Sequence, residues 1–158
     1  MTFYSADPIR FGSVSMVTAT PGSNDPEVGS KIIEGDEEYI FVYNNGNSQI
    51  NPGSGATVSA VTGYSVTVST VTMIDYVVGV CKHATLTTGT YGYLLTRGFG
   101  SAKMTANSAC AAGQLLTVGA DGAFAVKSIS TDAPGNVYAK VMVATASAGL
   151  ADAFFAIF

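Results

Sequence analysis

The sequence predicts an all-β protein: an antiparallel β-sandwich or barrel of short strands, with an extended N-terminal arm. Charged residues make up only 11% of the 158 residues, and 18 residues are glycine. Together with abundant Thr, Ser, Val and Ala, this composition favours short strands joined by tight turns over long helices. Strand-like segments also recur about every ten residues, which is typical of sandwiches and barrels. We expect one β-domain over residues 31–158, preceded by an arm over residues 1–30.

Residues 1–30 show no clear strand or helix period, and three prolines interrupt them. They are nevertheless too apolar for a disordered tail, because they include Phe3, Tyr4, Ile9 and Phe11. Two interpretations stay open for this segment. It is either an extended arm that docks on a neighbouring subunit or an edge strand that lies against its own domain.

The first half of the predicted domain contains three strand signals. Residues 39–43 are all strong β-formers, and Asn45-Gly46 then favours a type I′ turn. In residues 64–69, apolar and polar side chains alternate, and the phase slips near Ser69, which indicates a bulge or a strand break. Residues 76–81 form a continuous apolar run, as expected of a strand that is covered on both faces.

The second half repeats this pattern, with strands predicted at residues 91–95, 114–118, 123–127, 137–143 and 153–158. The last of these strands carries phenylalanine on both of its alternating faces, at Phe154, Phe155 and Phe158. We therefore expect the domain core to cover one face and a second sheet, or another subunit, to cover the other.

The charge distribution argues against several classes of partner. The net charge is −4, and the seven basic residues are scattered singly along the chain, whereas phosphate binding needs clustered Lys and Arg. No apolar run is long enough for a membrane-spanning helix, and the first residues do not resemble a signal peptide. We expect no nucleic-acid partner and no membrane partner, and we expect folding in a cytoplasm.

No local motif predicts catalysis, a metal or a cofactor, so we expect a protein that is not an enzyme. His83 is the only histidine, and we expect it to be exposed at the edge of a loop rather than to form a catalytic or metal site with Cys81. We expect Cys81 and Cys110 to be reduced and mostly buried, although a bridge between them stays open. The glycine clusters at residues 89–92, 98–100 and 119–122 lack the features of a phosphate-binding loop, and we interpret them as turns.

Arg97 is the one unusual charge, because it stands alone after an apolar strand and before Gly98. Such an arginine usually has a carboxylate or carbonyl partner. It is either an internal tie or an anchor at an interface.

Two blocks of sequence resemble the capsid decoration proteins of tailed bacteriophages, which are also called cement or head-stabilising proteins. The first block comprises residues 27–29, 35–44 and 47–50. The second follows a pattern of Gly-x-Tyr-Gly-aromatic, then Arg-Gly, then Ala-Gly-x-x-Leu. It lies at residues 88–93, 97–98 and 112–116 and is followed by Asp121-Gly122-Ala123-Phe124. Residues 1–26 match no pattern of this family.

The resemblance implies a structural virion protein on the outer capsid surface, folded in the host cytoplasm. It would bind between subunits of the major capsid protein and stabilise the shell, as a homo-oligomer for which a trimer is favoured. The expected capsid or subunit contacts are Phe3, Tyr4, Ile9, Phe11, Arg97, Phe154, Phe155 and Phe158. The alternative is a head-fibre base or a β-module that binds carbohydrate or the host surface. That module would need aromatics such as Tyr43, Tyr64 and Tyr91 on one face, and the chain has no tryptophan for such a site.

Overall fold

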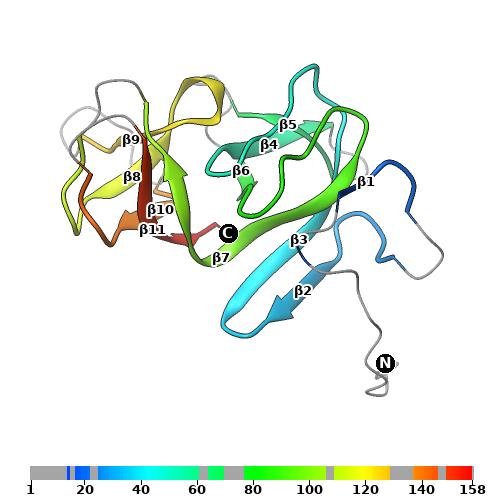
Figure 1. The fold of residues 1–158 in the computed structure, drawn as a ribbon, viewed down its shortest axis with the longest axis horizontal. Helices are drawn as coiled ribbons and strands as arrows, with labels where there is room; N and C mark the ends of the chain where they lie inside the picture. The colour runs from blue at the N-terminus through cyan, green and yellow to red at the C-terminus, as the bar shows by residue number, and fades with distance from the viewer. Residues whose placement is uncertain are drawn as a thin grey trace.

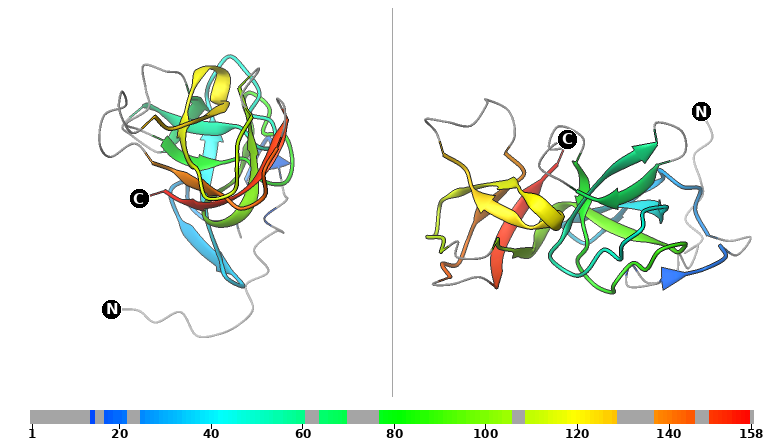
Figure 2. Two further views of the ribbon diagram at one scale, coloured as in Figure 1. Left: turned by 90° about the vertical axis from the view of Figure 1, so that its left-hand side faces the viewer. Right: turned by 90° about the horizontal axis from the view of Figure 1, so that it is seen from above.

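A computed structural model of the chain describes residues 14, 17–21, 25–60, 64–69, 77–105, 109–128, 137–145 and 149–157. Within these residues the protein is all-β, as the sequence predicts, and contains no α-helix. Two lobes lie side by side, and the long strand β7 (Tyr91–Lys103) runs through both of them (Figures 1 and 2). Phe3, Tyr4, Ile9, Phe11 and Phe158 lie outside the described residues.

The first lobe is a closed five-stranded barrel. Its strands are β3 (Glu37–Asn44), β5 (Ser65–Val68), β4 (Gly55–Ala60), β6 (Val77–Val80) and β7, paired in that order, and β7 pairs back with β3. Four of these pairings are antiparallel, so strand direction reverses four times around the ring. The fifth pairing must then be parallel, and Tyr43 and Asn44 of β3 indeed lie parallel to Ser65 and Val66 of β5.

The second lobe is a sheet built on the C-terminal half of β7. Strand β11 (Leu150–Ala156) pairs with β7 from Arg97 to Lys103, and β10 (Ala139–Val141) pairs with the other side of β11. Beyond β10 lie β8 (Leu115–Val118) and the edge strand β9 (Phe124–Val126), which follows a 3₁₀ turn, η2 (Ala120–Gly122).

A β-bulge marks the point where β7 leaves the barrel. Tyr39 is opposite Leu95 and Glu38 is opposite Arg97, so Thr96 is the extra residue, and its hydroxyl donates to the carbonyl of Glu38 at 3.0 Å. We predict a turn at residues 98–100 from the sequence, and that prediction is wrong, because they continue β7. Gly98 has a φ of 129°, and a Cβ there would lie 2.8 Å from the side chain of Glu37. Glycine therefore permits a close approach of two strands at this position.

The described part of the N-terminal segment lies against the barrel. Strand β1 (Val17–Thr18) pairs with Gly92 and Tyr91 at the start of β7, and Val14 is buried. The amide of Gly29 donates to the carbonyl of Phe41 at 2.7 Å. Residues 17–18 therefore follow the edge-strand alternative. Strand β2 (Lys31–Glu34) follows and forms a hairpin with β3 that projects from the barrel (Figure 1).

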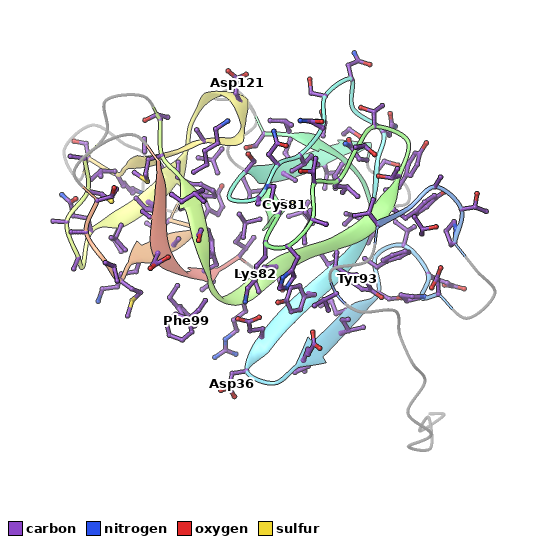
Figure 3. All side chains as sticks on the ribbon, in the orientation of Figure 1. Asp36, Cys81, Lys82, Tyr93, Phe99 and Asp121 are labelled. Atoms are coloured by element: carbon purple, nitrogen blue, oxygen red, sulfur yellow. The ribbon has the colours of Figure 1, made fainter. Side chains whose placement is uncertain are left out.

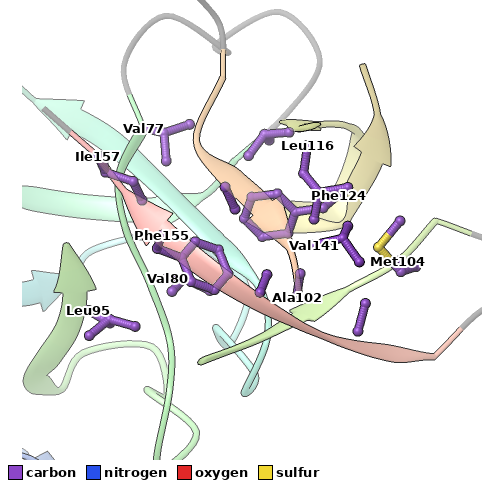
Figure 4. Close-up of a cluster of buried hydrophobic side chains, with 14 of the residues drawn as sticks. Val77, Val80, Leu95, Ala102, Met104, Leu116, Phe124, Val141, Phe155 and Ile157 are labelled. Carbon is purple, nitrogen blue, oxygen red and sulfur yellow. The ribbon is translucent and has the colours of Figure 1, made fainter. Parts of the chain in front are cut away.

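Two clusters of buried side chains follow from the alternation of side chains along β3 and β7. Ile40, Val42 and Leu94 belong to a cluster formed with residues of β4 and β5 in the barrel. The opposite faces of the same two strands contribute Phe41 and Leu95 to a larger cluster, which continues into the second lobe. There Phe124 and Phe155 pack edge to face with ring centroids 5.5 Å apart (Figure 4). One strand, β7, thus supplies side chains to both clusters.

The C-terminal strand is buried on its core face, as the sequence predicts. Phe155 is 0% exposed, and β11 is hydrogen-bonded on both sides, to β7 and to β10. The two cysteines are buried and unbridged. Val143, which shares a face with Val141 in the predicted strand, instead lies beyond the end of β10 and is exposed.

Neighbouring phenylalanines on β11 offer a matched test of this burial. Phe155→Ala removes a fully buried ring and should lower the free energy of unfolding by about 3–5 kcal/mol. Phe154→Ala removes a half-buried ring whose main described aromatic partner is Phe99, and should cost about 1 kcal/mol. Urea denaturation of both variants measures the difference. Equal losses would contradict the assigned faces of β11.

Candidate interaction surface

The solvent-facing side of the second lobe is the candidate functional surface. Directly paired residues of neighbouring strands point to the same face, so the register defines this side. We call it the outer sheet face. It carries Arg97, Phe99, Ser101, Lys103, Leu115, Lys140, Leu150, Asp152 and Phe154, and Met142 extends it just beyond the end of β10.

Several large apolar side chains are exposed on the outer sheet face. Phe99 is 56% exposed, and Leu150, Met142 and Leu115 are also exposed. In Figure 3 the ring of Phe99 points away from the domain. A shallow groove of about 440 Å³ lies here, lined by Phe99, Gly100, Ser101, Met142, Val143, Asp152 and Ala153. Exposed apolar side chains that gather beside a groove are typical of an interaction site.

Phe154 is a predicted contact residue that the structure places on this surface, as it does Arg97. Its ring meets that of Phe99 edge to face, with centroids 5.1 Å apart, and Phe99 is its direct partner across β7 and β11. Phe155, the next residue, points the other way and contributes to the core. Nothing in the described part of the chain covers the Phe99 side of the pair, so the outer face of β11 has no second sheet over it.

Arg97 is exposed at the corner where the outer sheet face meets the β2–β3 hairpin. It lies opposite Glu38 on β3 and Ala156 on β11. A hydrogen bond from Lys31 outweighs desolvation and holds the pKa of the Glu38 carboxyl below its usual value, and the charge of Arg97 adds to this effect. Arg97 is therefore an exposed cation beside a carboxylate that is already paired with Lys31.

A polar cluster fastens the hairpin to the barrel. Lys82 donates to both carboxylate oxygens of Glu37, at 2.5 and 2.6 Å, and Tyr39 donates its phenol proton to the same carboxylate. The Nε2 atom of His83 lies 3.0 Å from the phenol oxygen. Burial and the Glu37 carboxylate raise the pKa of Tyr39. For Glu37, desolvation is outweighed by hydrogen bonds from Lys82 and Tyr39, so its pKa is lowered.

Burial raises the pKa of the Cys81 thiol to about 11, which keeps it protonated near neutral pH. In the described ranges, no group of three or more His, Cys, Asp or Glu side chains is placed to hold a metal ion. No helix there is long and apolar enough to span a membrane.

Two further features bear on carbohydrate binding. The rings of Tyr43 and Tyr91 lie 4.6 Å apart but are half-buried, and exposed Tyr64 packs over Gly29. A polar groove of about 450 Å³ lies between the lobes, a feature that sequence reasoning missed. Its lining includes Asn47, Gln49, Lys103 and Asp121. The walls of the groove come from β5, from the end of β7, from loops of the barrel and from η2, so only the folded arrangement of the two lobes brings them together.

The fold has a counterpart in a phage head. It matches the crystal structure of the head fiber gp8.5 N base of bacteriophage phi29, with a TM-score of 0.50 and 16% sequence identity. The match covers 75% of this chain and 94% of that chain. No protein-family model and no curated protein matches the sequence. At this identity the similarity establishes the fold.

The Glu37 cluster predicts a pH dependence of stability. Because the pKa of Glu37 is lowered in the folded state, its contribution is fully present above the ordinary carboxyl pKa of 4.5 and is lost as the pH falls through the folded-state value. Glu37→Gln should therefore lose less stability than the wild type between neutral pH and about pH 3. Thermal melts across this range measure the effect.

Glu34→Gln is the control, because Glu34 is exposed and forms no ion pair among the described residues. If Glu37→Gln and the wild type lose stability in parallel, Glu37 does not contribute as the geometry indicates.

Proposed function

We propose that this chain is a structural protein of a tailed-phage virion, held on the outside of the head. The observation that carries the proposal is the fold match to the phi29 head fiber N base over three quarters of the chain. The decoration-like sequence blocks support the same location. The exposed apolar outer sheet face supports a role in adhesion, because such a surface is expected to be covered in an assembly.

Two roles fit a protein at this location. As a decoration protein it binds between major capsid protein subunits and stabilises the shell, with many weak contacts multiplied by symmetry. As the base of a head fibre it anchors a projecting structure. The fold match favours the fibre base, since the matched protein is itself described as a base. The two roles predict different consequences when the protein is removed.

Purified virions should contain the chain in hundreds of copies, all on the head. Quantitative mass spectrometry measures the copy number, and antibody labelling in electron micrographs locates the protein. A few copies, or labelling confined to the tail, would contradict the proposal. Virions that lack the protein separate the two roles, because loss of heat resistance indicates shell stabilisation, whereas missing projections on an equally stable shell indicate a fibre base.

The N-terminal arm should provide the capsid contact. Phe3, Tyr4, Ile9 and Phe11 would bury apolar area worth about 25 cal/mol per Å² on a neighbouring subunit. Deleting residues 1–12 should leave the melting temperature close to that of the wild type but abolish co-sedimentation with capsids. A full-length chain carrying Tyr64→Ser, which changes an exposed aromatic side chain on the barrel outside the outer sheet face, is the control and should still co-sediment. Unchanged binding by the truncated protein would show that the arm is dispensable.

A further inference from the structure

The outer sheet face and the β2–β3 hairpin have complementary charges, and both expose apolar side chains. The groove beside Phe99 is apolar, and cations stand near it at Arg97 and Lys140. Lys140 lies directly opposite Phe154, and no acidic side chain in the described ranges forms an ion pair with it. This is a basic margin on a protein whose net charge is −4.

The hairpin carries the opposite combination. Ile33 is 77% exposed and is the most exposed large apolar side chain among the described residues. Exposed Glu34 and Asp36 follow it, and neither forms an ion pair in that part of the chain. Lys31, the only cation of the hairpin, is already paired with Glu38 at 2.6 Å. Asp36 in the turn is therefore an unpaired carboxylate close to the apolar side chain of Ile33, whereas Glu34 shares the opposite face of the hairpin with Glu37.

We propose that the β2–β3 hairpin of one copy docks into the groove of a second copy of this chain. Ile33 packs against Phe99, Met142 and Val143 of the second copy, and the Asp36 carboxylate at the tip lies beside Lys140 of that copy. The hairpin is suited to this role because it projects beyond the barrel, and the polar cluster at Glu37 holds its base in place.

The position of the two surfaces allows the contact to be reciprocal. Asp36 at the tip and Phe99 lie toward the same side of the molecule (Figure 3). Two copies related by a two-fold axis can therefore each insert a hairpin into the other. Reciprocity doubles the buried area, which matters because stable interfaces bury about 1,200–2,000 Å² in total.

One charge in the groove opposes the docking, so removing that charge should strengthen the association. Asp152 lines the groove and is exposed, so it would face the incoming Asp36 carboxylate of the hairpin. Asp152→Asn removes this repulsion and should strengthen association.

The inference concerns purified protein without capsids, so its failure would leave the proposed location on the head untouched. Analytical ultracentrifugation of the full chain should show an oligomer of the 16.1 kDa subunit. Ile33→Asp should weaken association at least about tenfold, because an acidic group would enter the apolar groove. Lys140→Glu should also weaken it, and Asp36→Lys combined with Lys140→Glu should restore it, because the exchange re-forms the charge pair.

Tyr64→Asp is the matched control, because it also replaces an exposed apolar side chain by aspartate but lies on the barrel, away from both surfaces. It should associate like the wild type, as should the chain that lacks residues 1–12. Circular dichroism melts confirm that each variant is folded. A monomeric wild-type protein at high concentration, unchanged association of folded Ile33→Asp, or failure of the charge exchange to restore association would each overturn the proposal.

Discussion

The structure depends on the uninterrupted run of β7 through both lobes. Its first half closes the barrel against β3 and holds β1, and its second half pairs with β11 along seven registered positions. The transition between these halves needs the bulge at Thr96 and the absence of a side chain at Gly98, where β7 crosses close to Glu37. Packing on either side of β7 therefore couples the two lobes.

The pairing of β7 with β11 also determines which side chains the outer sheet face exposes. Phe155 is buried in the core, and because side chains alternate along β11, Phe154 must face outward. The same alternation on β7 directs Phe99 outward beside it. The outer sheet face is thus a geometric consequence of filling the core with aromatic side chains at adjacent positions. Whether the capsid or a second copy covers it, its position is set by the interior.

Much of this architecture could be predicted from local sequence. The alternation at residues 64–68 became β5, the apolar run at residues 76–81 became β6, and the C-terminal phenylalanines marked a strand with one buried face. The continuation of β7 through Gly98 and Gly100 could not be predicted. Glycine is needed at these positions because a side chain would lie close to Glu37 or Phe155, which are remote in sequence. The groove beside Phe99 could not be predicted from the sequence for a related reason. Its walls come from β7, β11 and the segment after β10, and only the register brings them together.

The connectivity of β7 also fixes an order of events during synthesis. All five barrel strands lie between Glu37 and Lys103, so the barrel has every strand it needs before the second lobe has been translated. The second half of β7 then has an unpaired edge until β11, the last strand among the described residues, is made. An exposed edge of this kind is a template for pairing with other chains. The nascent protein therefore exposes an unpaired strand edge in the interval between translation of β7 and translation of β11, when it can pair wrongly with other chains.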